Sequence, residues 1–217
     1  SAYGLATGFG DTGQVGIGGI TLGGGVGYLV RKHGLTIDSL LAAEVVTAEG
    51  HLLHVDAETH PDLFWAIRGG GGNFGVGTRF QFRLHEVDTV VGGMLMLPAT
   101  PEVLASFIAE AEGAPEELST IANVLPAPPT PDVPAEHHGK LVIMAMMCHT
   151  GEVEAGERAI APFRALAKPL LDTVRPMRYS ELYAPDDERG KEEEDHGPHP
   201  SSAARTMFVT TIDRCVA

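Results

Sequence analysis

Positive charge and long apolar runs are both scarce in this sequence of 217 residues. Lys and Arg number 15 against 29 Asp and Glu, which gives a net charge of −14 at pH 7. Because nucleic acids and anionic membrane surfaces attract clustered Lys and Arg, this balance argues against both as partners. There is no apolar run of roughly 18 residues, so no membrane-spanning helix is expected. With 43% hydrophobic residues, the chain can still bury a core.

Cysteine is nearly absent as well. Cys148 and Cys215 stand far apart and form neither a CxxC pair nor a metal-ligand spacing. A reducing compartment, and hence a cytoplasmic location, is the expectation, with a single disulfide left open. Ser1 is not an initiator Met, and no basic-then-apolar signal pattern follows it. We therefore expect the chain to be part of a longer protein.

The ten histidines do not form a convincing metal motif. The pairs His137-His138 and His196-x-x-His199 lie in Pro- and Glu-rich stretches, where no regular element would hold their geometry. Solvated loop histidines explain them better. The sequence predicts no metal site.

Glycine, by contrast, is abundant near the start of the chain. More than half of residues 13–27 are glycine. Glycine weakens helices and strands but permits positive φ and the close approach of another group to the backbone. A bare backbone with converging N–H groups suits an anionic or planar ligand. A tight turn with closely packed backbone explains the composition equally well, so both interpretations stay open on these residues alone.

Three blocks in a fixed order remove much of this ambiguity. They are Gly23–Asp38, Ala43–Gly50 and Asp62–Val76, the last containing Arg68-Gly69-Gly70-Gly71-Gly72-Asn73-Phe74-Gly75. Together they resemble the second half of the flavin-binding domain, of the PCMH type, in berberine-bridge-enzyme-like oxidoreductases. The resemblance implies an α+β fold that is incomplete at both ends: the second half of an FAD-binding domain in residues 1–88, and a truncated substrate-binding lobe with an antiparallel sheet in residues 89–217.

Local patterns predict the elements of both regions. In the first region we expect a glycine-laced helix over 16–33, strands at 40–47, 51–56 and 74–84, and a helix over 61–67. The second region should alternate strands at 90–97, 118–125 and 140–148 with helices at 101–112 and 153–167, followed by turn and short-helix character at 175–183 and a last strand at 207–213. This order predicts an antiparallel sheet with its helices on one side.

FAD is the cofactor that the resemblance implies, with a small-molecule substrate and an open oligomeric state. Carried over from the family, the isoalloxazine and pyrophosphate contacts are Val15, Gly16, Ile17, Gly18, Gly19, Thr21 and Gly23. The adenosine side corresponds to Gly72, Asn73, Phe74, Gly75 and Val76, and Val45 and Val46 would sit beside the adenine. For the two strand valines, ordinary core packing is an equally good explanation.

Several positions depart from the family pattern. Thr12 stands where plant members carry a cysteine bonded to the flavin, which excludes a cysteinyl link at that position. Ile20 replaces a histidine that some members place near the flavin carbonyl, and Val15 occupies a position that the family associates with dioxygen access. The catalytic base stays unknown. Tyr179, Glu181 and Tyr183 form a polar cluster that could line a pocket, but a surface helix turn explains them more simply.

The resemblance implies hydride transfer from a C–H bond of an alcohol, sugar or secondary metabolite to flavin N5, with reoxidation by O2. A non-catalytic fragment or degenerate paralogue that cannot hold FAD alone is the alternative, and weak flavin binding by these 217 residues is expected. A nicotinamide-binding Rossmann domain is disfavoured because the glycine spacing and the acidic strand end of that fingerprint are missing.

Overall fold

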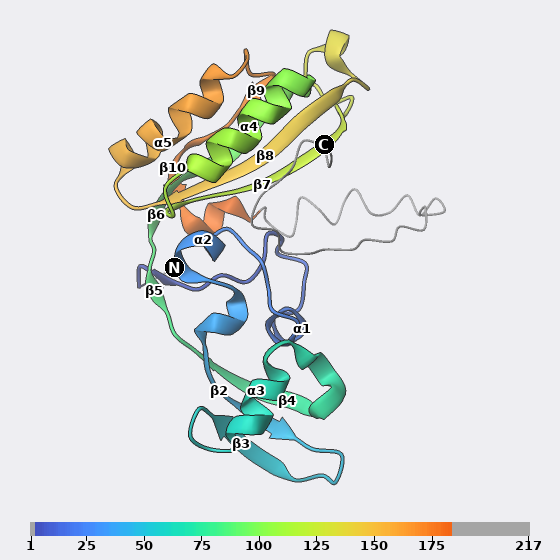
Figure 1. The fold of residues 1–217 in the computed structure, drawn as a ribbon, viewed down its shortest axis with the longest axis vertical. Coiled ribbons are helices and arrows are strands. Elements are labelled where there is room, and N and C mark those ends of the chain that lie inside the picture. The colour runs from blue at the N-terminus through green and yellow to red at the C-terminus, as the bar shows by residue number, and fades with distance from the viewer. Residues whose placement is uncertain (1–2, 184–217) are drawn as a thin grey trace.

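The computed structural model describes residues 3–183, in which two groups of elements lie one above the other (Figure 1). The lower group comprises β1 (Leu5–Ala6), α1 (Ile17–Leu22), α2 (Val30–His33), the 3-10 helix η1 (Thr36–Ser39), β2 (Leu40–Val46), β3 (Leu52–Asp56), α3 (Pro61–Gly70), the 3-10 helix η2 (Gly71–Phe74), β4 (Val76–Phe82) and β5 (His85–Glu86). The upper group comprises β6 (Thr89–Pro98), α4 (Pro101–Gly113), β7 (Leu118–Pro126), η3 (Ala135–His137), β8 (Leu141–Thr150), α5 (Val153–Ala165), β9 (Leu171–Asp172), β10 (Arg175–Arg178) and η4 (Tyr179–Leu182). The predicted strand at 207–213, Cys215 and the histidines at 196 and 199 lie outside the described residues.

The helix predicted over 16–33 is wrong in extent, because two short helices occupy this stretch. Between α1 and α2 the backbone takes positive φ at Gly24 (113°) and Gly25 (80°), which no helix continues through. The carbonyls of these two glycines accept hydrogen bonds from Ile37 N at 3.0 Å and Thr36 N at 2.9 Å. The glycines therefore form a turn that is bonded to η1.

A three-stranded antiparallel sheet in the order β3-β2-β4 forms the base of the lower group. Its predicted hairpin is confirmed, with Ala43 opposite Val55 and a positive φ of 82° at Gly50. One face of the sheet packs with α3 in a core that includes Val45, Val55, Phe64 and Ile67. Strand β4 begins at Val76, two residues later than predicted, because Phe74 belongs to η2.

The upper group is an antiparallel sheet in the order β10-β6-β8-β7, with β9 also paired to β6. Strands β6, β7 and β8 and helices α4 and α5 match the predicted order, with end points shifted by up to two residues. Strands β9 and β10 were not predicted, since only turn and short-helix character was expected at 175–183, where η4 does form. Helix α4 begins where expected, since the Thr100 hydroxyl accepts a hydrogen bond from Val103 N at 3.3 Å and Pro101 occupies the first turn.

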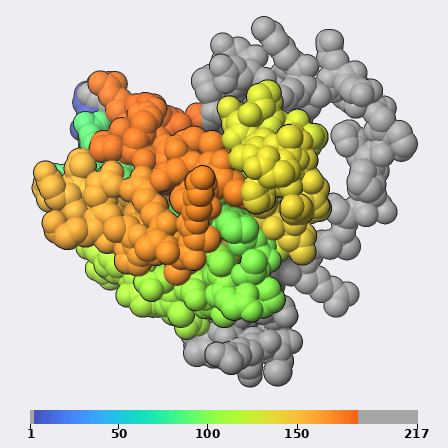
Figure 2. All heavy atoms as spheres, turned by 90° about the horizontal axis from the view of Figure 1, so that it is seen from above, coloured from blue at the N-terminus to red at the C-terminus, as the bar shows by residue number. Residues whose placement is uncertain are grey.

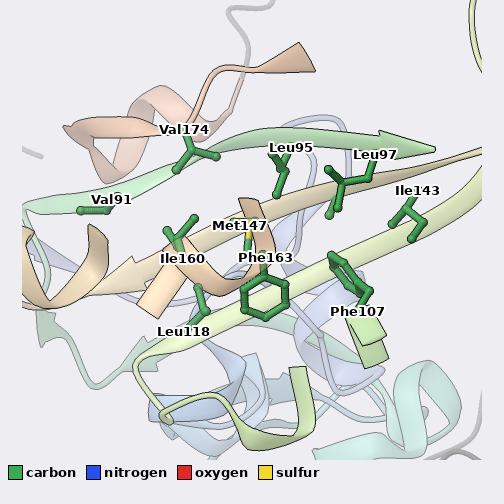
Figure 3. Packing of buried hydrophobic residues seen from close by; sticks show 11 residues of the cluster. Val91, Leu95, Leu97, Phe107, Leu118, Ile143, Met147, Ile160, Phe163 and Val174 are labelled. Atoms are coloured by element: carbon green, nitrogen blue, oxygen red, sulfur yellow. The ribbon is translucent and has the colours of Figure 1, made fainter. Parts of the chain in front are cut away.

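Both helices cover the same face of this sheet. Phe107 of α4 and Phe163 of α5 meet edge to face, with ring centroids 5.1 Å apart, over Ile143 and Met147 of β8 (Figure 3). Viewed from above, the surface is formed mainly by α4, α5, the loop after β7 and the segment that follows α5 (Figure 2). The opposite face of the sheet consequently points toward the lower group. Within the described residues, no helix is long and apolar enough to cross a membrane.

Candidate functional site

The two glycine-rich segments of the lower group lie side by side. Helix α1, from the first segment, packs against α3 and η2, which carry the second segment, and Figure 1 shows it next to them. Strand β4 lies beside α1 as well, since a Cβ added at Gly18 would be 3.6 Å from the Phe80 ring of β4. The two segments are therefore neighbours, as a shared ligand requires.

Part of this region is bare of covering protein. Within the described residues, a Cβ added at Gly13, Gly16, Gly19 or Gly72 would meet nothing within 4 Å beyond its chain neighbours and the backbone of its own helix. Large apolar side chains beside these glycines are also uncovered, with exposed fractions of 49% for Val15 and Ile17 and 66% for Val76. Exposed apolar groups around bare backbone form a surface on which a flat ring system can lie. We call Gly13, Val15, Gly16, Ile17 and Gly19 the glycine ledge.

Other glycines of the same sequence run serve internal packing. A Cβ at Gly27 would lie 2.5 Å from the carbonyl oxygen of Gly10, and one at Gly25 would overlap the Thr36 side chain. At Gly75 a side chain would collide with the carbonyl of Val46. Close packing of the backbone therefore explains Gly25, Gly27 and Gly75, and ligand binding stays a prediction for the uncovered glycines.

Several residues expected at the flavin make contacts within the protein instead. Thr21 is buried, and its hydroxyl donates to Ile17 O at 2.6 Å, while Gly23 ends α1 by donating its N–H to Gly19 O. Val45 is only 1% exposed and packs in the core, and its strand β2 is paired on both sides, with Leu53 and Gly77 opposite Val45. Asn73 donates from Nδ2 to Gly70 O at 2.6 Å and stabilises the turn of η2. Roles in cofactor binding remain predictions for all these positions.

The tyrosines of η4 form a link to the glycine-rich segment. The hydroxyls of Tyr179 and Tyr183 lie 2.9 Å apart, and Tyr183 donates to Gly10 O at 3.0 Å. Burial raises the pKa of both phenols, which therefore stay protonated at neutral pH. Glu181 instead faces solvent and pairs with Arg175 at 3.0 Å. The cluster holds η4 against residue 10 and offers no base.

Arg31 of α2 connects the two groups of elements, a role that sequence reasoning missed. Its guanidinium donates to Ala111 O at 3.0 Å, Ala114 O at 2.8 Å and Leu118 O at 3.2 Å. The first two carbonyls belong to the negative end of α4, where a cation is favourable. No local pattern predicts this contact, because Arg31 and Ala111 of α4 are 80 residues apart in the chain.

A stacked histidine pair lies near the same junction. The rings of His33 and His85 have centroids 4.0 Å apart, and His85 Nε2 lies 3.1 Å from the Ser39 hydroxyl. Burial and neighbouring positive charge lower the pKa of both imidazoles, the charge coming from Lys32 and His85 at His33 and from Arg83 at His85. Both rings are therefore held in the neutral form.

This pair predicts a loss of stability in mild acid. Because each folded-state pKa lies below the unfolded value of about 6.5, the unfolded chain binds more protons, and the free energy of unfolding falls as pH drops below about 6.5. In denaturant titrations from pH 7.5 to 5, His85→Gln should show a shallower decline than the parent protein. The control His51→Gln, at an exposed position, should keep the parent slope. Equal slopes for all three proteins would contradict the lowered pKa of the His33–His85 pair in the folded state.

Within residues 3–183, no group of three or more His, Cys, Asp or Glu side chains is placed to hold a metal ion. The one cysteine in this part of the chain, Cys148, is buried, which raises the pKa of its thiol to about 12.

Comparison with known proteins gives a consistent picture. Residues 1–56 match the family model described as an FAD binding domain. The chain is 32% identical over 200 residues to (R)-6-hydroxynicotine oxidase of Paenarthrobacter nicotinovorans, an alignment that covers 88% of this chain and 41% of the relative. Its fold is similar to that of crystalline 6-hydroxy-D-nicotine oxidase from Arthrobacter nicotinovorans, with a TM-score of 0.73, 29% identity, and 83% and 39% of the two chains covered. A berberine-bridge-enzyme-like protein of Physcomitrella patens gives a TM-score of 0.65 at 26% identity, covering 80% and 36%.

The resemblance to berberine-bridge-enzyme-like, FAD-linked oxidoreductases is confirmed. The α+β fold of these PCMH-type flavoproteins is confirmed with it, and FAD is the cofactor that the matches indicate. This berberine-bridge-like chain spans about two fifths of the relative's length. The division into domains at residue 88 stays a prediction.

The glycine ledge fits such a cofactor. It presents backbone amide groups and two exposed aliphatic side chains, and in the part of the chain that the structure describes nothing from other elements lies within 4 Å of a Cβ added at Gly16 or Gly19. As the resemblance implies, Val15, Gly16, Ile17 and Gly19 would lie against the ring system and pyrophosphate of FAD, and Gly72 of η2 would lie on its adenosine side.

Proposed function

We propose that this chain forms part of an FAD-dependent oxidase. The overall reaction removes a hydride and a proton from a CH–OH or CH–NH group, which leaves a carbonyl or imine. The two electrons and two protons finally reduce O2 to H2O2. Bound FAD supplies the hydride acceptor, at its N5 position. The glycine ledge, bare and apolar beside η2, is the observation that carries the proposal.

The residues of the chain contribute binding and orientation to this reaction. Val15 and Ile17 would shield one side of the ring system from water, which would strengthen the electrostatic interactions made there. The N–H groups of the first turn of α1 lack carbonyl partners inside the helix and are available to an acceptor on the ligand. Tyr183 holds the segment before the ledge through Gly10. Tyr179 and Tyr183 are held protonated and therefore supply no base, and the catalytic base stays unknown.

Titration with FAD, followed by flavin fluorescence, tests the cofactor, and anaerobic addition of alcohols, amines and saccharides to the loaded protein tests the reaction. We expect saturable quenching of flavin fluorescence, bleaching of its visible absorbance by a substrate, and H2O2 on admission of air. Weak affinity is expected of the 217 residues alone. Absence of saturable quenching would instead favour the non-catalytic alternative, which the partial coverage of the relatives keeps open. Bleaching without H2O2 would identify a dehydrogenase.

A further inference from the structure

A cavity of about 470 Å³ lies where strand β8 ends and helix α5 begins. Its walls come from Lys32 of α2, from Pro115 and Glu117 before β7, from residues 149–152, and from the first turns of α5. In Figure 1, α2 lies below the sheet and α5 above it, so the cavity borders both groups of elements. It shares no residue with the glycine ledge. We call it the α5 cavity.

His149 stands in the wall of the α5 cavity as a buried polar side chain. The residue is 3% exposed, and within residues 3–183 its Nδ1 has no hydrogen-bond partner. A Cβ added at Gly156 would lie 3.1 Å from Nδ1, and one added at Gly151 would lie 3.5 Å from Cε1, so this edge of the ring faces the start of α5. Burial lowers the pKa of His149, an effect that Glu117 opposes and Lys32 reinforces, and the ring is therefore neutral at pH 7. A buried nitrogen without a partner is unfavourable, and such groups in native proteins often mark a bound water or ion.

The charges around the cavity favour an anion with a single negative charge. The N–H groups in the first turn of α5 lack carbonyl partners within the helix, and Glu152 at the N-cap does not bond them with its side chain. Arg158, also in the wall, makes no ion pair or hydrogen bond with its side chain in the part of the chain that the structure describes. Lys32 is already paired with Glu117, with Nζ 3.7 Å from Oε1. The carboxylates of Glu117 and Glu152 would repel a dianion such as phosphate more strongly than a monoanion.

The rest of the wall is apolar, since Pro115, Ala155 and Ala159 contribute hydrocarbon surface. The volume of the cavity lies within the range of small-molecule sites. We propose that the α5 cavity binds a small organic carboxylate, whose charged group lies between the start of α5 and Arg158 and whose apolar body lies against Ala155 and Ala159. This inference does not depend on FAD or on the proposed function, because none of these residues belongs to the glycine ledge.

Histidine NMR on the 217-residue protein without flavin tests the proposal. The imidazole Hε1–Cε1 signal of His149 is assigned through nuclear Overhauser contacts with Gly151 and Gly156, which adjoin the ring. Sodium benzoate, benzamide or inorganic phosphate is then titrated in at constant pH and ionic strength. Benzoate should shift this signal saturably and leave the signal of the exposed His51 unshifted. Benzamide, which has the same ring without the charge, should give no saturable shift in the same concentration range. Equal binding of benzamide, tighter binding of phosphate, or no shift with benzoate would each overturn the proposal.

Variants of α5 locate the bound carboxylate. Ala155→Leu fills the cavity from its wall and should abolish the benzoate shift. Its matched control is Ala161→Leu, an exposed position on the same helix outside the cavity, which should leave the dissociation constant for benzoate unchanged. Arg158→Gln should raise that constant about 2- to 5-fold, the range expected for an exposed charge, and Arg158→Lys should restore part of the loss.

Circular dichroism and the thermal midpoint verify that each of these variants is folded. Undiminished benzoate binding by folded Ala155→Leu or Arg158→Gln would place the ligand elsewhere and overturn the proposal. Titration with FAD separates this inference from the proposed function, since the α5 variants should bind FAD as the parent protein does. If no flavin binds, the proposed function fails and the benzoate result still decides whether the α5 cavity takes a carboxylate.

Discussion

Replacement of Gly19 by leucine is expected to abolish most FAD binding while leaving the protein folded. Gly19 lies within α1, where leucine is a better helix former than glycine by a substantial part of 1 kcal/mol. Apart from its chain neighbours and the backbone of its own helix, no atom of residues 3–183 lies within 4 Å of the position of an added Cβ. The new side chain would therefore occupy the volume into which the proposed cofactor fits, and nothing in the fold opposes it.

The expected loss can be bounded from the cost of inserting extra methylene groups into a close contact. That cost is about 1–3 kcal/mol, which corresponds to a roughly 5- to 150-fold increase in the dissociation constant for FAD. Gly19→Ala should give a smaller effect in the same direction. Fluorescence titration with FAD measures both variants, and circular dichroism and the thermal midpoint verify that each remains folded.

Ala109→Leu provides the matched control, because it enlarges an exposed residue on α4, in the other group of elements. Its affinity for FAD should equal that of the parent protein. Unchanged affinity in Gly19→Leu, in protein that is demonstrably folded, would remove the glycine ledge from the cofactor site. The same result would leave the fold and the family resemblance intact, since neither depends on where the ring system lies.

Much of the fold followed from local sequence patterns. The strands at 118–126 and 141–150 and the helices around 101–113 and 153–165 agree with prediction because apolar spacing, Pro101, and the glycines at 139 and 151 are local signals. The turn at Gly24 and Gly25 was missed because glycine allows a helix and a positive φ alike. Hydrogen bonds from the Thr36 and Ile37 N–H groups to the carbonyls of Gly25 and Gly24 stabilise the turn. These donors lie outside the glycine run, so the run alone does not predict the turn.

The candidate site was predictable in outline only. Family blocks placed both glycine segments, but composition alone could not separate Gly19, which is open, from Gly27, which is packed. The contacts of Arg31 with α4 and of Tyr183 with Gly10 join residues 80 or more positions apart. No local pattern encodes such pairs. Positions like Val45 show the converse, since a residue assigned to the ligand by resemblance has its side chain in the core.

Gly27→Ala is expected to destabilise the protein strongly, although its backbone φ does not fall in the left-handed region that favours glycine. At such positions glycine to alanine ordinarily stabilises a protein by about 0.4–1 kcal/mol, because it restricts the unfolded chain. Here the added methyl group would lie 2.5 Å from Gly10 O and 2.9 Å from Gly10 C and N. These are main-chain atoms, so no side-chain rotation relieves the overlap, and a cost of about 2–3 kcal/mol or more is expected.

The matched control is Gly16→Ala, in the same glycine run, where φ is −64° and no atom lies within 4 Å of the added methyl group. Urea denaturation should show Gly16→Ala at or slightly above the stability of the parent, and Gly27→Ala well below it. Next to the crossing of residues 10 and 27, the Tyr28 hydroxyl donates to Asp11 O at 2.8 Å. These contacts hold the segment that leads into the glycine ledge. Gly27→Ala should therefore weaken FAD binding even at temperatures where the variant is still folded. Equal stability of the two variants would show that the main chains do not cross this closely, and would remove the framework on which the glycine ledge depends.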